Sequence, residues 1–501
     1  MVAKLIRPFF LITILFFMAI FSNAGMTRVG MLGVSVGMVL EPPHLDPTAG
    51  AAGAIDEIVY ANLFEGLTKI DRNGHVQPLL AKSWTISGDG KTYTFSLEKN
   101  VRFHDNTSFD ANDVIFSFER AMALDSVNAQ KNLFEPIQSM EAKDPYTLII
   151  HLKRPTGDFL YNLGWGDAAI VAKESYENNK ISPVGTGPYR FVRWDKGNQV
   201  ILTRTYFYWG TKPSIDQVTF KFISDPTAAM IAMQSGDIDA FPNFPAPELL
   251  SKLQKDPKFK VVIGTTEGET ILAINNRRPP LNNKIVRQAI CHAIDRQSIV
   301  DGAMFGYGTP IGSHFAPHHP AYIDLTKQNQ YNPALAKKLL SEAGYKPGEL
   351  ALVIKLPPPS YARRGGEIAA AQLQKAGFKI DLIPVEWAQW LDDVFRRKDF
   401  DLTIISHTEP LDINIYARLD YYFGYDNPAF KDIINLVAQT TSDEKKIPLY
   451  QSAQKMLADD SVNCFLFQLA KHGVWNAQLG GMWENSPIQA NDMTEVFWDL
   501  R

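Results

Sequence analysis

The spacing of apolar positions changes within residues 270–304, and this stretch organises our interpretation of the whole chain. Its first part is a strand-like apolar run. Its second part places apolar side chains at steps of three and four residues, which gathers them on one face of a helix. Pro279 and Pro280 restrict the backbone between the two parts, so the strand cannot run directly into the helix. We therefore predict a strand, a turn and an amphipathic helix, and a second globular lobe that begins here.

The chain before this stretch alternates between helical and strand-like patterns. We predict helices over residues 55–66, 110–122 and 226–239, and strands over residues 146–152 and 217–223. Asp110 and Asp113 have the spacing of a helix N-cap and its capping box, and the helix after Pro226 is expected to end near Gly236. Between Trp84 and residue 110, a Gly-Asp-Gly turn joins two runs rich in Thr, Tyr and Phe, which indicates a β-hairpin.

The chain after residue 304 shows the same alternation. We predict helices over residues 331–345, 361–377, 387–397, 429–440 and 443–459, and strands over residues 352–356, 379–385 and 400–406. Residues 463–476 form a further strand-like run that can carry the chain back to the first lobe. Because no long low-complexity linker separates the patterns, we expect two interleaved α/β lobes joined by crossing strands.

Composition limits the classes of function. A chain of 501 residues is too long for one hydrophobic core, and 45% apolar with 21% charged residues is typical of a globular protein. The formal net charge is -4, and no basic domain indicates a nucleic-acid partner. The sequence contains no H-E-x-x-H motif, Walker loop or cysteine zinc knuckle, so we expect no cofactor and no enzyme activity.

The first 24 residues have the pattern of a secretory signal. Lys4 and Arg7 precede a continuous apolar run, and small residues follow it up to Ala24. We predict export to the periplasm with cleavage near Ala24. The alternative is a retained membrane anchor, although the run is shorter than a spanning helix requires. No cysteine directly follows the run, so we do not expect a lipoprotein. The chain has two cysteines, Cys291 and Cys464, and the sequence leaves open whether they are bridged or buried as free thiols.

Several motifs resemble one family. The pivot reads NNRRPPLNNKIVRQAICHAIDRQSIV, and the first lobe contains PLLAKSW, DGKTYTFSL, VRFHD, FSFER, GTGPYRF and SGDID. These resemble the family 5 extracytoplasmic solute-binding proteins, the peptide, opine and nickel receptors of bacterial ABC importers. The resemblance implies a bilobed α/β fold of the periplasmic-binding-protein type II (cluster C) class, with an extra subdomain in the first lobe. It also implies a monomer that binds a small molecule or oligopeptide and delivers it to an inner-membrane ABC permease.

The resemblance also implies domain bounds. After the signal peptide, residues 1–24, we expect lobe 1 to comprise residues 25–62, 181–268 and 472–501. The extra subdomain is expected over residues 63–180, and lobe 2 over residues 269–471.

The loop after the predicted strand 400–406 is the best candidate for the ligand site. Ligands of open α/β sheets bind beyond the carboxyl ends of strands, and an acid beside indoles suits a cationic group. The residues there are His407, Thr408, Glu409 and Asp412, with Trp387 and Trp390 on the preceding helix. In the peptide-binding relatives an aspartate after this strand takes the α-ammonium group. The resemblance gives that role to Asp412, with Glu409 as the alternative; both could equally be solvated loop acids.

Three further residues complete the predicted site. Arg397 could bind a carboxylate through two parallel hydrogen bonds. Glu41 lies in a first-lobe loop where family members contact the ligand, and Tyr361 begins a predicted helix. The loop sequence TEPLDINIY departs from the family's usual DYPDPDNFL, so the ligand stays open among a peptide, an opine, a sugar derivative and a metal chelate.

Alternative functions rest on other residues. His314, His318 and His319 are close enough in sequence to suggest a metal or metallophore receptor. Residues 33–37 match the G-x-S-x-G pattern of serine hydrolases, with Ser35 as the nucleophile, but the pattern requires a strand that turns sharply into a helix, and here two prolines follow. A sensor that reports a solute to a membrane kinase would have the same sequence features as a transport receptor.

Overall fold

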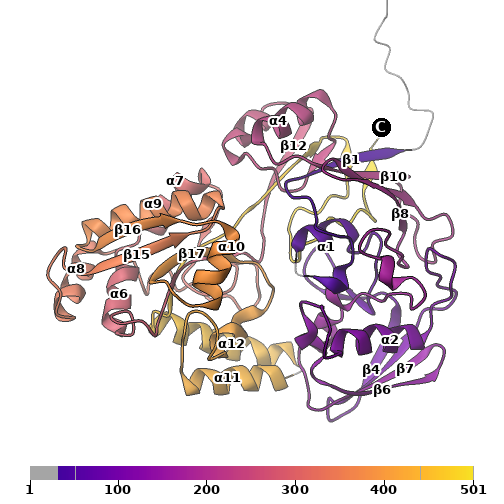
Figure 1. Ribbon diagram of the computed structural model, residues 1–501, viewed down its shortest axis with the longest axis horizontal. Coiled ribbons are helices and arrows are strands. Elements are labelled where there is room, and N and C mark those ends of the chain that lie inside the picture. The colour runs from indigo at the N-terminus through magenta and orange to yellow at the C-terminus, as the bar shows by residue number, and fades with distance from the viewer. Residues whose placement is uncertain (1–31, 51, 441, 500–501) are drawn as a thin grey trace, which may run out of the picture.

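The computed structural model describes residues 32–499 except residues 51 and 441 (Figure 1). The predicted signal sequence and its cleavage near Ala24 lie outside these residues. In the described part of the chain, no helix is both long enough and apolar enough to cross a bilayer. The three larger sheets have seven, six and four strands, and helices pack against them. This is the mixed α/β architecture that the sequence predicts.

The seven-stranded sheet combines segments from both ends of the chain and from its middle, in the order β12-β19-β11-β1-β10-β9-β8. Its strands are β1 (Gly33–Met38), β8 (Tyr189–Asp195), β9 (Gln199–Arg204), β10 (Gln217–Phe222), β11 (Ala240–Phe241), β12 (Phe259–Gly264) and β19 (Lys471–Asn476). Helix α1 (Gly53–Val59) shares a buried core with β1 and β10, whereas α4 (Pro226–Ser235) packs in a second core with Phe241 and Val474.

Of two helix ends predicted in this lobe, one is confirmed and one is wrong. Helix α4 ends at Gly236, whose φ of 80° is the left-handed conformation expected of a C-cap glycine. Helix α1 is shorter than the predicted 55–66 because it ends at Val59, and Tyr60 is already extended. The prediction was wrong there because apolar residues continue beyond Val59 at helical spacing, so the sequence pattern does not mark the end of the helix.

The four-stranded sheet is antiparallel and precedes β8 in sequence. Its order is β4-β5-β7-β6, with β4 (Ala81–Ile86), β5 (Thr92–Leu97), β6 (Ile137–Asp144) and β7 (Thr147–Leu152). Helix α2 (Ala111–Met122) covers it with Phe118. The predicted capping box is confirmed, since Asp110 accepts from Asn112 and the Asp113 carboxylate accepts from the Asp110 backbone at 2.8 Å.

The six-stranded sheet has the order β14-β18-β13-β17-β15-β16. Its strands are β13 (Glu269–Ile274), β14 (Thr309–Pro310), β15 (Ala351–Leu356), β16 (Lys379–Pro384), β17 (Leu402–His407) and β18 (Asn463–Gln468). One core contains α6 (Lys284–His292), α7 (Arg296–Met304), α8 (Pro333–Glu342) and α9 (Ser360–Lys375). The other is rich in aromatic rings and includes residues of α11 (Pro428–Gln439) and α12 (Asp443–Asp459).

Two predicted helices of this lobe are divided. The helix after Pro280 breaks at Ala293, and α7 starts anew where the Asp295 carboxylate accepts from the backbone of Gln297 and Ser298. The helix predicted over residues 387–397 consists of a short α10 (Trp387–Trp390) followed by a π-helical stretch, Leu391–Arg396.

Strands cross between the two largest sheets at two places, as predicted. The chain leaves β12 in the seven-stranded sheet and enters β13 in the six-stranded sheet within a few residues. It returns from β18 to β19 between Gln468 and Lys471. Figure 1 shows the two sheets on opposite sides of the molecule, with these connections between them.

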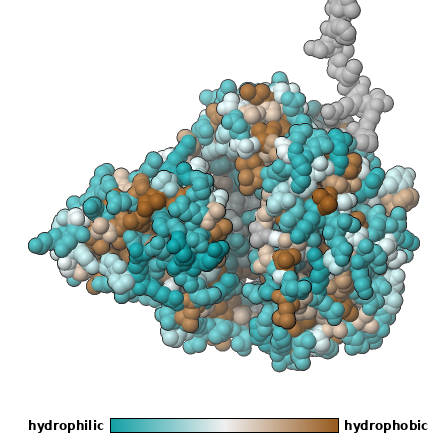
Figure 2. Space-filling model, in the orientation of Figure 1, coloured by the Kyte–Doolittle hydropathy of each residue, from teal (hydrophilic) through white to brown (hydrophobic). Residues whose placement is uncertain are grey.

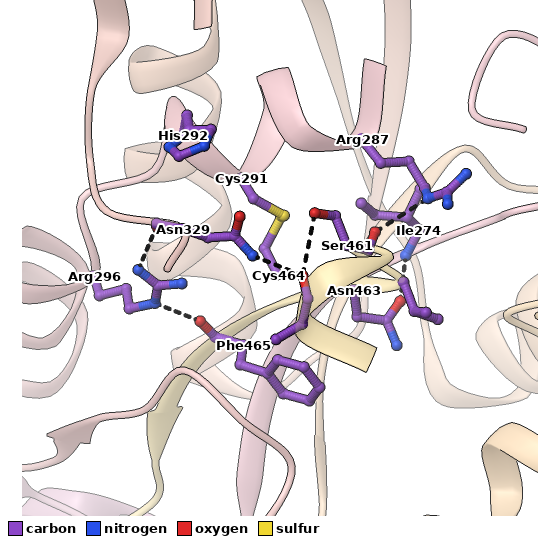
Figure 3. The surroundings of a disulfide bond; sticks show 12 residues. Ile274, Arg287, Cys291, His292, Arg296, Asn329, Ser461, Asn463, Cys464 and Phe465 are labelled. Atoms are coloured by element: carbon purple, nitrogen blue, oxygen red, sulfur yellow. Dashed lines mark hydrogen bonds between the residues drawn. A yellow bond between two sulfur atoms is a disulfide. The ribbon is translucent and has the colours of Figure 1, made fainter. Parts of the chain in front are cut away.

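Cys291 and Cys464 form a disulfide, which resolves the alternative that the sequence left open. The bond joins α6 to β18 within one core, and the two Cα atoms are 5.2 Å apart (Figure 3). Both residues are buried. Nearby, Arg296 donates through Nε to the carbonyl of Phe465 at 2.7 Å, and Arg287 donates to the carbonyl of Ser461 at 3.1 Å. The disulfide thus ties α6 to β18, and buried hydrogen bonds tie α7 to β18 and α6 to the residue Ser461 shortly before β18.

Candidate functional site

The predicted ligand loop begins where β17 ends, at the edge where polar groups of neighbouring strands meet. His407 pairs in register with Glu269, the first residue of the adjacent antiparallel strand β13. The loop then leads into a short 3-10 helix, Asp412–Ala417. Glu269 was not among the predicted residues, because its proximity comes from strand pairing across 138 positions of sequence and not from a local motif.

Asp412 lies in a buried polar cluster. Its Oδ1 atom is 2.8 Å from Nε2 of His314, and its Oδ2 atom is 3.6 Å from Nδ1 of His407. The opposite side of the His314 ring faces Glu269, with Nδ1 and Oε1 3.2 Å apart. His314 is 1% exposed and the side chain of Asp412 is 11% exposed. The Asp412 carboxylate is therefore engaged inside the lobe.

Burial changes the protonation of this cluster. Burial, and then the carboxylate of Asp412, raise the pKa of Glu269 well above its ordinary value. Burial lowers the pKa of His407, although Asp412 opposes the effect, and the His407 Nε2 atom is 3.0 Å from the hydroxyl of Tyr422. The raised pKa of Glu269 favours its protonated form, which reduces the negative charge buried in the cluster.

The same cluster supplies the groupings that could hold a metal ion. Among the described residues, ligand atoms of Glu269, His314 and Asp412 lie within 4.8 Å of one another, as do those of His407, Glu409 and Asp412. The predicted histidine trio is not assembled in this way. His318 contacts Glu267 at 2.6 Å, and His319 stacks on Phe315 with ring centroids 4.2 Å apart. Burial lowers the pKa of His319 to about 4. The three imidazoles thus have three different sets of neighbours.

A pocket with a volume of about 100 Å³ opens beside Glu409. Thr408, Glu409 and Pro410 contribute to it from the six-stranded lobe. The other lining residues come from the N-terminal half and the C-terminal segment: Gly50, Ala52, Gly53, Asp56, Tyr60, Ala129, Gln130, Trp165, Gly166, Asp167, Ile488 and Gln489. Figure 2 shows a furrow between the two halves of the molecule. The pocket is therefore formed where the two lobes face each other.

The pocket is acidic. Asp56, Asp167 and Glu409 line it, and no Lys, Arg or His is among its described lining residues. Burial, followed by the nearby carboxylates of Asp167 and Glu57, raises the pKa of Asp56 well above its ordinary value. Burial raises the pKa of Asp167 to about 7. The sequence gives no signal for Asp56 and Asp167, because they belong to separate segments without a binding motif. Only the fold brings them into the same pocket as Glu409.

Two other predicted residues border β17 from within the lobe. The hydroxyl of Tyr361 accepts a hydrogen bond from the Ser406 backbone at 3.2 Å, and burial raises its pKa to about 12. The Trp390 indole donates to the Thr403 hydroxyl at 3.0 Å in the aromatic core. Trp387 packs edge-on against Trp390 and is 42% exposed. Tyr361 and Trp390 therefore contact β17 itself, and none of the three side chains lines the pocket.

Arg397 and Glu41 have partners of their own. Arg397 forms ion pairs with Asp392, at 2.9 Å, and with Asp393. Glu41 accepts hydrogen bonds from the Trp194 indole at 2.9 Å and the Gly197 backbone at 2.8 Å. Neither side chain is among the residues that line the pocket.

Ser35 lies in the middle of β1, which pairs in parallel with β10 and β11. The strand continues through Gly37 to Met38, so no helix follows the serine as a nucleophile elbow requires. A Cβ atom on Gly37 would come within 2.4 Å of the Phe241 ring. This glycine therefore permits close packing of the sheet core.

Comparison with known proteins gives one consistent group. Residues 75–430 match the family described as bacterial extracellular solute-binding proteins, family 5 Middle. The dipeptide-binding protein of Escherichia coli K12 is 28% identical over 436 residues, which covers 77% of this chain and 79% of that protein. The glutathione-binding protein GsiB of Salmonella paratyphi A is 30% identical over 351 residues, 69% of this chain and 68% of that protein.

Solved structures agree over nearly the whole chain. The periplasmic binding protein DppA of Helicobacter pylori, in complex with the peptide STSA, superposes with a TM-score of 0.82 at 25% identity. The match covers 94% of this chain and 99% of that one. The oligopeptide-binding protein AppA of Bacillus subtilis, in complex with a nonapeptide, gives a TM-score of 0.80 at 25% identity and covers 93% and 99% of the two chains.

Proposed function

The chain belongs to family 5 of the bacterial extracellular solute-binding proteins, and from this premise we propose that it captures a short peptide or amino-acid-derived solute between its lobes. It then delivers the solute, chemically unchanged, to an inner-membrane ABC permease. We propose further that it acts as a monomer in the periplasm after cleavage of the signal sequence near Ala24. The relatives named for dipeptide and glutathione binding support this class of cargo.

The single observation that carries the proposal is the acidic pocket between the lobes. Glu409 lines it from the loop after β17, where an ammonium group of the cargo would meet a carboxylate in a partly desolvated space. We place the amine at Glu409 and not at Asp412, because Asp412 is held by His314 and does not line the pocket. In this arrangement Asp412 and His314 hold the loop in position and do not contact the cargo.

Contacts across the furrow support a clamp that closes on its cargo. Lys446 on α12 donates to the Asp158 carboxylate at 2.7 Å, and the backbone of Gly157 donates to the carbonyl of Ala438 at 3.0 Å. Gln489 donates to the Thr408 hydroxyl at 3.1 Å, beside the pocket. A solute that touches both lobes binds only the closed form fully, so its differential affinity shifts the population toward closure.

We propose the lobe bounds that the family resemblance implies. Lobe 1 would comprise residues 25–62, 181–268 and 472–501, and its subdomain residues 63–180. Lobe 2 would comprise residues 269–471. The division of the strands among the three larger sheets supports these bounds.

Glu409→Gln tests the site directly. We expect the variant to bind alanyl-alanine at least about 10-fold more weakly than the wild type, because an amide replaces the charge that pairs with the ammonium group. Asp412→Asn is the matched comparison from the same loop and should lose less affinity. Isothermal titration calorimetry gives both values. If Glu409→Gln bound the dipeptide as tightly as the wild type and Asp412→Asn lost much of its affinity, Asp412 and not Glu409 would be the residue that binds the ammonium group.

A further inference from the structure

We propose that Asp56 and Asp167 form a second anchoring subsite, in the first lobe, for a cationic group of the cargo. The cargo is then a small solute with two positively charged groups, one at Glu409 and one at this acid pair. This inference rests on the proposed function and specifies its substrate class: dibasic amino-acid derivatives, peptides with a basic side chain, and diamines.

The two carboxyl groups lie close together although they come from different elements. Asp56 belongs to α1, and Asp167 to the short 3-10 helix Gly166–Ala168. A Cβ atom built on Gly166 would lie 2.2 Å from Oδ1 of Asp56. The Asp56 carboxyl group therefore rests against the backbone directly before Asp167, and any larger residue at position 166 would displace it.

Hydrogen-bonding capacity in this corner of the pocket is unused. Oδ1 of Asp56 and Oδ1 of Asp167 are both buried and have no hydrogen-bond partner in the described protein. Asp167 is 7% exposed and lines the pocket. A buried carboxylate oxygen without a hydrogen-bond partner is costly when the group is ionised, so this pair of acids requires either bound protons or a cation. An ammonium or guanidinium group supplies both the charge and several N–H donors.

The neighbouring groups do not provide that cation. The other titratable side chains that line the pocket are Glu409 and Tyr60, and the Tyr60 hydroxyl already donates to the carbonyl of Gly164 at 2.8 Å. The pocket also holds one unused donor, the indole Nε1 of Trp165, which is buried without an acceptor. A solute with cationic groups and a carbonyl or carboxylate oxygen would satisfy the acids and the indole together.

A metal ion fits this corner less well than an organic cation. The groups of three or more described His, Cys, Asp or Glu side chains that could hold an ion involve Asp412 and its neighbours, and none includes Asp56 or Asp167. Two carboxylates with an indole N–H beside them offer few ligands to a divalent cation, which prefers six or more oxygens. The indole is instead suited to a solute that carries both charges and acceptors.

Matched peptides test the subsite. Lysyl-alanine and alanyl-lysine would be compared by calorimetry with the same dipeptides carrying norleucine, which retains the aliphatic chain and lacks the charge. Diaminoalkanes of four to six carbons would be compared with the corresponding monoamines. We expect the wild type to bind the tighter lysine dipeptide at least about 10-fold more strongly than its norleucine counterpart.

Asp56→Asn and Asp167→Asn should abolish that preference while retaining affinity for the norleucine dipeptides, which shows that the pocket is intact. Glu119→Gln, an exposed carboxyl on α2, serves as the matched control and should keep the preference. Equal binding of lysine and norleucine dipeptides by the wild type would overturn the proposal, as would a lysine preference that survives in both variants. So would stabilisation by magnesium or calcium ions that depends on Asp56 and Asp167, with no effect of amines.

The outcomes also separate this inference from the proposed function. Binding of neutral dipeptides with no preference for lysine would leave the peptide receptor standing and remove the second subsite. Binding of diamines that depends on Asp56 and Asp167, without binding of any dipeptide, would support the subsite and reject a peptide cargo. No binding of any dication would overturn the subsite.

Discussion

Glu409 and Asp412 are three residues apart in one loop, yet the fold gives the two carboxylates different environments. Asp412 is bonded to His314 inside the lobe, whereas Glu409 faces the pocket. At this scale the sequence could predict the loop but not the role of each acid, because the partner His314 is 98 positions away. Asp56 and Asp167 were missed for the same physical reason: their surroundings are created by tertiary contacts.

The raised pKa of Asp167, about 7, predicts a pH dependence of binding. A cation favours the ionised carboxylate, so affinity should rise as the pH increases through 7, because fewer protein molecules must release a proton from Asp167 when the cation binds. We expect affinity for the tighter lysine dipeptide to increase on the order of 10-fold between pH 5.5 and pH 7.5.

Asp167→Asn should flatten this rise. The variant is the necessary comparison because other groups near the pocket also titrate: burial raises the pKa of Glu57 to about 7 and that of Asp56 well above its ordinary value. Calorimetric titrations at four pH values would give the slopes. Identical slopes in wild type and variant would show that Asp167 does not titrate on binding.

The elements were predicted best where one face of a helix or strand meets one core. Helix α2, with its capping box, and α4, with its glycine end, follow the local pattern. The pattern could not predict the break between α6 and α7, since apolar residues continue through it and only the Asp295 cap marks a new start. The π-helical stretch after α10 likewise has no distinct sequence signal.

The bond between α6 and β18 leads to a prediction about stability. The disulfide closes a loop of 173 residues, so removing it should lower the free energy of unfolding by about 2 to 5 kcal/mol. Urea unfolding of the wild type with and without reductant would measure the difference. The double variant Cys291→Ala and Cys464→Ala should unfold near the reduced wild type and show no response to reductant. Coincident curves for oxidised and reduced wild type would contradict this.

The arrangement of the whole molecule follows from two connections, β12 to β13 and β18 to β19, which join the sheets. The sequence could predict these crossings because each is a strand-like run without a linker, and the family resemblance gave the bilobed fold. The contacts across the furrow could not be predicted, since Lys446 and Asp158 are 288 positions apart and carry no shared motif.

The Lys446 contact predicts an effect on closure. Lys446→Met should weaken binding of the lysine dipeptide several-fold, because the partly buried pair with Asp158 forms only when the lobes meet. Lys445→Met is a matched control: Lys445 is the exposed neighbour on the same helix, and its replacement should leave affinity unchanged. Calorimetry would measure the affinity of both variants for the lysine dipeptide. Equal affinities of Lys446→Met and Lys445→Met would show that the contact between Lys446 and Asp158 does not contribute to closure.

Small-angle X-ray scattering of the wild-type protein, without cargo and with a saturating amount of the dipeptide or diamine that binds most tightly, tests the central claim most directly. A receptor that closes on its cargo should show a smaller radius of gyration at one solute per chain, and the solute should be recovered intact. A profile that does not change at saturation, or a solute recovered in cleaved form, would contradict the account.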